Sequence, residues 1–273
     1  MYRRADELLT ERDEEKEVRE VHVISSKWND FNHELQIYDG ESPEILDMEK
    51  IDFNVSDEKI CVGGFEDGYT PCPDERVVDK FRQCGECAPE EIPKLECIFE
   101  PQDCEGCSGG FCEETHAVYL AFHGIVPKIG MTSKDRLRER LIEQGADAYA
   151  LLSTVEDRKT AREEEMKLSG KLGISQRVSS KKKLKRMARK LDKKIVERKY
   201  RGVKNRVPVG ELVFLEDYPI ELPLRAKPRV RSVPGPHSGK TVGIKGEFLI
   251  YENSGLQALK ISNLVGRKML IKI

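Results

Sequence analysis

All eight cysteines of this 273-residue chain lie in one window, and the rest of the chain contains none. Such a window, rich also in glycine and proline, has too few apolar residues for a hydrophobic core of its own. Cross-links or metal ions must therefore hold it together. The eight are Cys61, Cys72, Cys84, Cys87, Cys97, Cys104, Cys107 and Cys112.

Two pairs of these cysteines have the Cys-x-x-Cys spacing, Cys84 with Cys87 and Cys104 with Cys107. Two intervening residues let both sulfurs of a tight turn face one ion, and zinc modules use this spacing repeatedly. Eight thiolates divide into two tetrahedral four-cysteine sites, so we predict two structural zinc ions. In sequence order, the first site takes Cys61, Cys72, Cys84 and Cys87, and the second takes Cys97, Cys104, Cys107 and Cys112. An interleaved division of the ligands stays open.

Disulfides are the alternative to zinc. They require an oxidising compartment or an intracellular hyperthermophile protein. The chain starts Met-Tyr-Arg-Arg-Ala-Asp-Glu, without an apolar signal segment, which favours zinc and a cytoplasmic protein. His116 could replace one cysteine as a ligand, although a lone histidine is more often a surface or core residue.

Acidic and basic residues separate along the chain. Residues 1–116 hold 32 Asp and Glu against 12 Lys and Arg, whereas residues 117–273 hold 17 against 35. Such asymmetry indicates a basic surface for a polyanion and an acidic part with another role. No apolar run approaches the length of a membrane span. We expect nucleic acid, and no membrane, as the partner.

The residue pattern predicts an α+β protein. Short strand-like runs precede the cysteines, and the last part of the chain holds strands separated by proline and glycine turns, which is typical of a small closed or half-open β-barrel. The predicted parts are an acidic leader and small β segment (1–60), a double zinc-knuckle module (61–115), an α/β domain (116–179), a long basic helix (180–206) and a β-rich C-terminal domain (207–273).

The α/β domain has the predicted order β-β-α-β-α. Polarity alternates from Ala117 to His123, which indicates a strand with two different faces. Ser133 is a candidate N-cap for the first helix, and Gly173 ends the second. The predicted elements are strands 117–123 and 126–131, helix 133–144, strand 148–152 and helix 155–172.

The predicted basic helix holds 14 Lys and Arg against Asp192 and Glu197. This density exceeds an ordinary solvated face and favours binding to phosphate backbones. With Tyr200 as the one aromatic residue, base stacking is not expected, so recognition would depend on backbone and shape, as in structured RNA or duplex DNA. The predicted contacts are Lys181, Lys182, Lys183, Lys185, Arg186, Arg189, Lys190, Lys193 and Lys194.

Two triplets in the α/β domain resemble those of GIY-YIG nucleases. Ala117-Val118-Tyr119 stands for the first and Lys128-Ile129-Gly130 for the second, with eight residues between Tyr119 and Lys128. Residues 20–273 also resemble an uncharacterised, largely archaeal family of zinc-binding proteins, distant relatives of these nucleases. That resemblance rests on the cysteines and on stretches such as Glu143–Ala146 and Ile244–Ile250, and it implies no established activity.

The nuclease resemblance implies a catalytic site. In that family the first tyrosine is, or orients, the base, a helix arginine holds the phosphate, and a glutamate binds a divalent metal. The matching residues here are Tyr119, Arg140 and Glu165, with magnesium or manganese as the implied ion. Arg136 and Arg138 are alternatives for the arginine. Helical spacing from Ala161 and Leu168 selects Glu165 over its two neighbouring glutamates.

The chain departs from the nuclease pattern at two positions, because Lys128 replaces a tyrosine and Ala117 a glycine. Lysine cannot act as tyrosine does, although it neutralises a phosphate. His123, on the face of Tyr119, is a candidate to share the base role. Two hypotheses follow. One is a zinc-containing, divalent-metal-dependent endonuclease acting on structured RNA or DNA. The other is a non-catalytic RNA-binding protein associated with the ribosome or tRNA. RNA is favoured over DNA in both.

Overall fold

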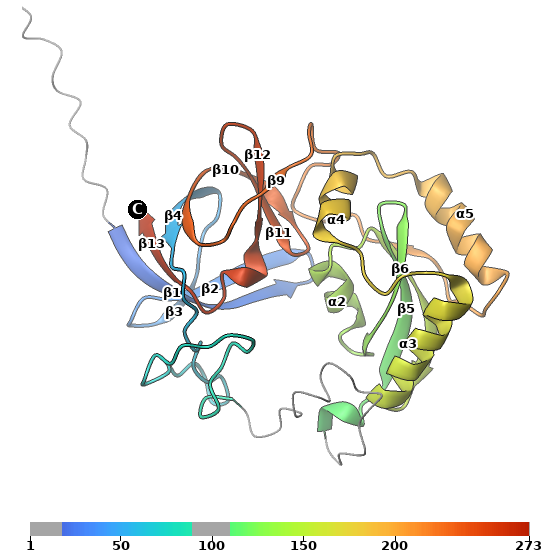
Figure 1. Cartoon of the computed structure of the whole chain (residues 1–273), viewed down its shortest axis with the longest axis horizontal. Coiled ribbons are helices and arrows are strands. Elements are labelled where there is room, and N and C mark those ends of the chain that lie inside the picture. The colour runs from blue at the N-terminus through green and yellow to red at the C-terminus, as the bar shows by residue number, and fades with distance from the viewer. Residues whose placement is uncertain (1–17, 89–109, 273) are drawn as a thin grey trace, which may run out of the picture.

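The computed structural model describes residues 18–88 and 110–272, which form two β-sheets with helices between and beside them (Figure 1). The strands are β1 (Val18–Asn29), β2 (Asn32–Tyr38), β3 (Pro43–Ile45), β4 (Lys50–Val55), β5 (His116–His123), β6 (Val126–Ser133), β7 (Ala148–Val155), β8 (Val213–Phe214), β9 (Arg229–Val230), β10 (Gly235–Lys245), β11 (Phe248–Glu252), β12 (Leu256–Lys260) and β13 (Lys268–Lys272). The helices are α2 (Leu137–Glu143), α3 (Arg158–Leu172), α4 (Ser180–Met187) and α5 (Lys193–Lys204), with short 3-10 turns η2 (Gly110–Cys112) and η3 (Ile261–Asn263). None of these described helices has the length and apolar character needed to cross a membrane.

The large sheet unites strands from both ends of the chain. Its order is β3-β2-β1-β13-β4-β10-β11-β12-β9. The last strand, β13, lies between β1 and β4 and pairs antiparallel with both. A closed C-terminal barrel is therefore wrong: over the described residues, strands β9–β13 form one sheet together with the N-terminal strands. The five-part division of the chain stays a prediction.

The small sheet carries the predicted β-β-α-β-α order. Its strands are arranged β6-β5-β7-β8, and α2 and α3 follow β6 and β7 along the chain. Asp157 caps α3 by accepting a hydrogen bond from the Thr160 backbone N–H, and Gly173 ends the helix in a left-handed conformation, as predicted. Ser133 does not cap the first helix. It ends β6 and is buried, and α2 begins only at Leu137.

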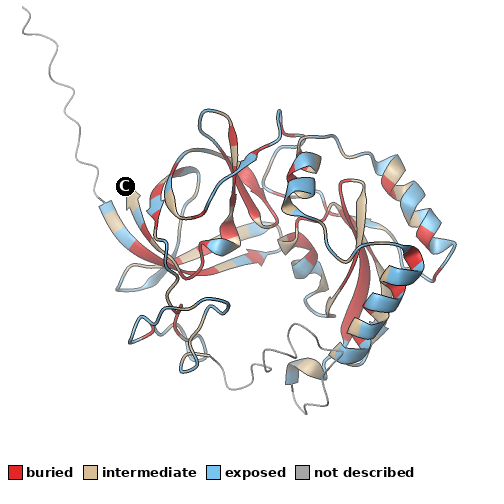
Figure 2. Ribbon diagram, in the orientation of Figure 1, coloured by how far each residue is buried: buried red, intermediate tan, exposed pale blue. Residues whose placement is uncertain are grey.

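Both faces of β5 are buried, and each face contributes to a different core (Figure 2). Val118, Leu120 and Phe122 pack with apolar residues of α3 and α5. Tyr119 and Ala121 face the other way and join the core that contains α2 and the large sheet. The small sheet is thus a middle layer. This position explains why its polar-looking face, with Tyr119 and His123, is no less buried than its apolar face.

The predicted long basic helix is two helices. Residues 188–192 are not helical, and Asp192 starts α5 by accepting a hydrogen bond of 3.0 Å from the Ile195 backbone N–H. Leu184 and Met187 of α4 pack against β11 and β12, whereas Val196 and Val203 of α5 pack against the small sheet. The two apolar stripes serve different cores, so a single straight helix could not bury both.

The two sheets meet where two glycines touch. Gly145 follows α2, Gly246 lies in the β10–β11 turn, and both have positive φ angles. A Cβ atom at Gly246 would lie 2.4 Å from the Gly145 backbone nitrogen, so no other residue fits without a shift. The Trp28 indole N–H donates to the Gly246 carbonyl oxygen at 3.2 Å. This junction places α2, α4 and the β10–β11 turn around one space.

Candidate functional site

Four cysteines meet in the segment between β4 and the small sheet. The sulfur atoms of Cys61, Cys72, Cys84 and Cys87 all lie within 4.8 Å of one another. A tetrahedral zinc ion with Zn–S bonds of about 2.3 Å separates its sulfurs by roughly 3.8 Å. The described cysteines form no disulfide. The first predicted ligand set is therefore confirmed as a cluster at metal-binding distance, and its donors fit zinc.

Tight turns hold these four sulfurs in place. Gly63 has a φ of +84°, and a Cβ atom there would lie 2.1 Å from the Thr70 carbonyl oxygen, so the Cys-Val-Gly-Gly turn requires glycine. Backbone N–H groups of Gly63 and Cys84 point at the Cys61 sulfur, at 3.5 and 3.2 Å. Such N–H···S contacts stabilise thiolates, the form that binds zinc.

Of the second predicted zinc site, only one ligand lies among the described residues. Cys97, Cys104 and Cys107 lie outside the described residues, and Cys112 is partly exposed in η2. His116 is not part of the first cluster. It is buried at the start of β5, and its Nδ1 lies 2.6 Å from the Glu114 carbonyl oxygen. The second zinc ion stays a prediction.

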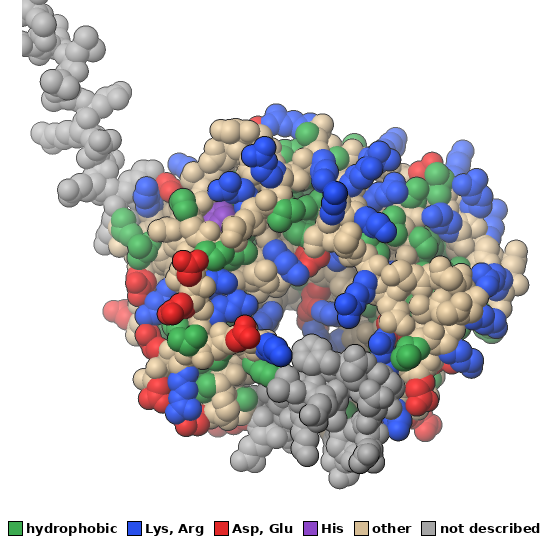
Figure 3. Space-filling view, viewed as in Figure 1, with side chains coloured by type: hydrophobic (Ala, Val, Ile, Leu, Met, Phe, Trp, Pro, Cys, Tyr) green, Lys and Arg blue, Asp and Glu red, His purple; other side chains and the backbone are tan. Residues whose placement is uncertain are grey.

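A basic groove of about 930 Å³ lies between the two sheets; we call it the groove. Figure 3 shows Lys and Arg side chains around a hollow at the centre of this face. Among the described residues, eight Lys and Arg side chains line the groove against two Glu. The cations are Arg82, Lys128, Arg136, Arg140, Arg177, Lys182, Lys183 and Lys260.

The two carboxylates of the groove neutralise only part of this charge. Glu143 bridges Arg136 and Arg140, at 3.0 and 2.9 Å. Glu247 bridges Lys183 and Lys260, at 3.0 and 2.9 Å. The remaining four cations form no ion pair with a described carboxylate; they are Arg82, Lys128, Arg177 and Lys182. Crowded, unpaired cations on a concave surface favour an anionic ligand.

The cysteine module, which we define as residues 60–88, supplies one wall of the groove. Arg82 lies two residues before the ligand Cys84, and its carbonyl oxygen accepts from the Val62 backbone N–H at 2.9 Å. The neighbouring Gln83 side chain donates to the carbonyl oxygens of Gly63 and Cys87. The loop that carries the metal ligands therefore fixes the position of Arg82.

Tyr119 and Lys128 are connected through one glutamine. Gln144 donates from Nε2 to the Tyr119 hydroxyl at 3.0 Å and accepts from the Lys128 ammonium at 2.6 Å. Gly130 makes room for the tyrosine, because a Cβ atom there would lie 2.6 Å from the ring and its hydroxyl. Burial raises the pKa of Tyr119 to about 12, so the phenol keeps its proton at neutral pH.

Lys128 lies at the groove with an altered acidity. Burial, together with the positive charges of Lys183 and Arg140, lowers the pKa of Lys128 to about 8. A minor fraction of the Lys128 side chains is therefore a neutral amine at physiological pH. Arg140 also lines the groove, about half exposed, and donates to Glu143.

Glu165 is buried on the stripe where helical spacing placed it, but its partner is an arginine. Arg162 donates to the Glu165 carboxylate at 2.8 Å and also contacts Gln176 at 2.9 Å. Burial raises the pKa of Glu165. Among the described residues, the four cysteines are the one group of three or more potential metal ligands. With its carboxylate held by a cation, Glu165 does not present a donor set that fits magnesium or manganese.

His123 does not line the groove. It lines a smaller space of about 310 Å³ on the other side of Lys183, which we call the small cavity. His123 therefore lines a different space from Lys128, Arg140 and Gln144, and Tyr119 lines neither space.

The predicted nucleic-acid contacts divide between three places. Lys182 and Lys183 line the groove. Lys183, Arg186, Arg189, Lys190 and Lys193 line the small cavity. Lys181, Lys185 and Lys194 line neither and are exposed. Sequence reasoning missed Arg82, Arg177 and Lys260, which stand alone in the sequence; Gln144 lies within a stretch that the family resemblance had already selected.

Comparison with known proteins identifies the family. Residues 49–268, most of the chain, match the family described as "Protein of unknown function (DUF2797)", and the chain belongs to this family. No curated protein and no solved structure matches the chain.

Proposed function

We propose that this member of the DUF2797 family is a cytoplasmic, zinc-containing protein that binds the phosphate backbone of a nucleic acid, RNA in preference to DNA, in the groove. The observation that carries the proposal is the composition of the described part of the groove wall, with eight cations and two carboxylates. Neutralising phosphates releases condensed counterions, which makes such a surface bind polyanions strongly at low salt.

The shape of the groove supports a structured ligand. Its cations come from the cysteine module, from β6, from α2 and the residue before it, from α4 and the segment before it, and from β12. A backbone lying in the groove meets positive charge on several sides, whereas a flat surface offers it on one. Among the described residues, Trp28 is the one aromatic side chain that lines the groove, which does not favour recognition by base stacking. Backbone and shape recognition is typical of folded RNA, and tRNA or the ribosome is the proposed partner.

The double variant Arg177→Glu with Lys182→Glu tests this site. Both residues are exposed, line the groove and form no described ion pair, so the fold should tolerate the change. We expect affinity for total tRNA to fall roughly 10- to 100-fold at moderate salt, and the slope of log K against log salt to fall by about 2. Fluorescence anisotropy at several salt concentrations measures both quantities.

Two further double variants with the same charge change serve as comparisons. Lys171→Glu with Arg198→Glu alters exposed residues outside both cavities and should bind as the unmodified protein does. Lys181→Glu with Lys185→Glu changes the exposed face of α4. If that variant loses as much affinity as the groove variant, the ligand lies on the α4 surface and the proposed site is wrong.

Phosphodiester hydrolysis is the second candidate function. The observation that favours it is Lys128, whose pKa of about 8 places a partly neutral amine beside Arg140 and hydrogen-bonded to Gln144. A neutral amine takes a proton from the attacking water or hydroxyl, and an adjacent guanidinium stabilises the charge that develops on phosphate. Tyr119, protonated and linked through Gln144, acts here as a positioning residue.

Cleavage should rise with pH through about 8 if Lys128 is the base, because the free amine then replaces the ammonium. Lys128→Arg keeps the positive charge but not the base, so it should retain RNA binding and lose cleavage by at least 100-fold. Total tRNA, ribosomal RNA and duplex DNA are the substrates, with and without magnesium or manganese. An unmodified protein that binds RNA tightly and cuts none of them would leave only the binding function.

A further inference from the structure

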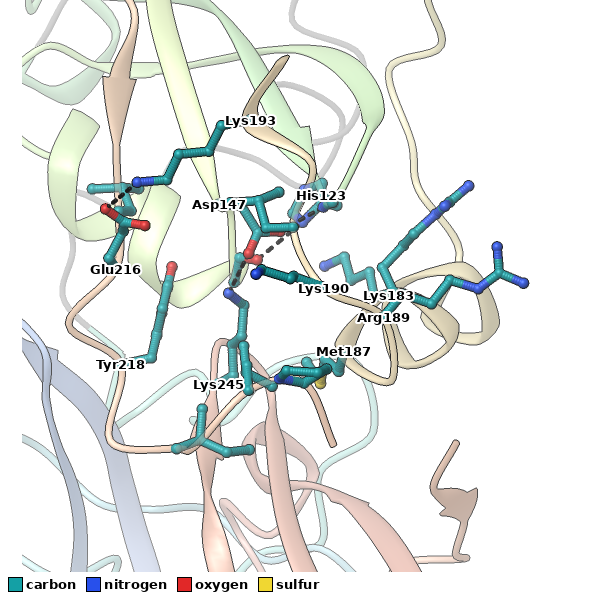
Figure 4. A pocket seen from close by; sticks show the side chains of 18 residues that line it. His123, Asp147, Lys183, Met187, Arg189, Lys190, Lys193, Glu216, Tyr218 and Lys245 are labelled. Carbon is teal, nitrogen blue, oxygen red and sulfur yellow. Dashed lines mark hydrogen bonds and ion pairs between the residues drawn. The ribbon is translucent and has the colours of Figure 1, made fainter. Parts of the chain in front are cut away.

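The small cavity lies next to the groove, at the junction of three separate parts of the chain (Figure 4). These are the β5–β6 turn with the residues that follow α2, helix α4 with its connection to α5, and the segment 215–223 together with Lys245 of β10. Its volume of about 310 Å³ is at the lower end of the range for small-molecule sites. It therefore suits a ligand of the size of one nucleotide.

The floor of the small cavity is a buried ion pair. Lys245 contacts Asp147 at 2.6 Å and also lies 4.2 Å from the centre of the Tyr218 ring. The other Asp147 oxygen accepts a hydrogen bond from the Gly124 backbone N–H. These groups satisfy one another, so the floor does not require a charge from the ligand.

One residue that lines this cavity has a polar side-chain atom without a hydrogen-bond partner among the described residues. His123 is 2% exposed, and its Nδ1 lies 3.2 Å from the Gly145 carbonyl oxygen. Since a carbonyl oxygen only accepts, Nδ1 carries the hydrogen and Nε2 is left as an acceptor. Nε2 is buried without a hydrogen-bond partner among the described residues. A ligand N–H or O–H would supply the missing donor.

The side of the cavity nearest α4 is positively charged. Figure 4 shows Lys183, Arg189 and Lys190 on this side, across from Glu216 and Tyr218. Lys193 pairs with Glu216 at 2.8 Å, and Lys183 with Glu247. By contrast, Arg186, Arg189 and Lys190 form no ion pair with a described carboxylate. These three cations are free to hold an anionic group.

The remaining walls are apolar and come from Met187, Leu191, Leu215, Ile220 and Leu222. The cavity thus offers an apolar slot, one buried acceptor and a cationic side. We propose that it binds a single nucleotide, with the base in the slot donating to His123 Nε2 and the phosphate on Arg186, Arg189 and Lys190. Free nucleotides and an unpaired nucleotide of a bound strand present the same chemistry. Lys183 lines both spaces, so a strand in the groove has a short path to the small cavity.

Calorimetric titration with AMP, GMP, CMP and UMP tests the proposal, with inorganic phosphate and ribose 5-phosphate as comparisons. At least one nucleotide should bind tenfold or more tightly than either comparison, because only the nucleotide fills the apolar slot. Arg189→Glu, at an exposed position, should weaken nucleotide binding at least tenfold, whereas Arg198→Glu, exposed on α5 and outside the cavity, should not. Phosphate that binds measurably and as tightly as the nucleotides, or equal effects of the two variants on nucleotide binding, would overturn the proposal.

The His123 ring reports occupancy directly in the unmodified protein. In protein whose histidines are labelled with nitrogen-15, the NMR signal of His123 Nε2 should shift when a ligand donates a hydrogen bond to this atom. If an oligonucleotide moves the signal and mononucleotides do not, the ligand is a nucleotide of a bound strand. If neither moves it, His123 is not a contact and the site is wrong. The groove variant Arg177→Glu with Lys182→Glu should still bind nucleotides, which separates failure of this site from failure of the groove.

Discussion

Cys61→Ser should remove one zinc ion per chain and unfold the cysteine module. Cys61 is almost fully buried at the centre of the cluster and receives two backbone N–H contacts. Structural zinc contributes roughly 10–16 kcal/mol of apparent binding free energy at neutral pH, far more than the few apolar contacts of such a segment can replace. Elemental analysis of protein purified without added metal gives the zinc content. Hydrogen exchange of backbone amides in residues 60–88 reports the unfolding.

Loss of this zinc should also weaken RNA binding, because Arg82 is held at the groove by backbone contacts within the same module. We expect the salt slope of tRNA binding to fall by about 1, as for the loss of one phosphate contact. Cys112→Ser is the informative comparison. It should remove the second zinc ion and leave protection in residues 60–88 unchanged. A protein that holds no zinc, or a Cys61→Ser variant that holds as much as the unmodified protein, would exclude the first site.

The cysteine cluster could be predicted because its information is local. The Cys84–Cys87 spacing and the Cys-Val-Gly-Gly turn each specify a tight loop, and a shared ion brings the loops together whatever the rest of the chain does. The same is true of strands β5, β6 and β7 of the small sheet, whose hairpin and helices follow one another within about sixty residues, whereas β8 joins from beyond α5. Short-range patterns were sufficient for both.

The large sheet could not be predicted in the same way. Strand β13 lies between β1 and β4, and more than two hundred residues separate β13 from β4 in the sequence. Hydrophobic alternation indicates a strand but does not identify its neighbours. The groove has the same origin, since Arg82 and Lys260 meet Lys128 only after the sheets assemble.

The break in the basic helix was visible in the sequence and was overlooked. Asp192 is one of two carboxylates in a basic segment, but aspartate is also a preferred N-cap, and Asp192 caps α5. Glu165 shows the opposite case. Its burial was predicted from helical spacing, whereas its pairing with Arg162, three residues earlier on the same helix, changes its chemistry from metal ligand to ion-pair partner.

Lys245→Met should destabilise the protein by about 3–5 kcal/mol, because it leaves the Asp147 carboxylate without its cation in a buried place. The Lys245 side chain is 3% exposed and that of Asp147 is 14% exposed. The pair connects β10 of the large sheet to the residue before β7 of the small sheet. Losing it therefore acts on the contact between the two sheets. Urea denaturation followed by far-ultraviolet circular dichroism gives the free energy of unfolding.

A double-mutant cycle separates the pair from the cost of either substitution. Asp147→Asn keeps an acceptor for the Gly124 backbone N–H and removes the charge. With Lys245→Met it leaves no buried charge, so the double variant should lose at least 2 kcal/mol less than the sum of the single variants. Lys193→Met is the matched control, because its pair with Glu216 is about half exposed and should contribute less than about 1 kcal/mol. If Lys245→Met costs no more than Lys193→Met, the buried pair is not what holds the two sheets together. The contact between Gly145 and Gly246 would then be the main connection between the two sheets.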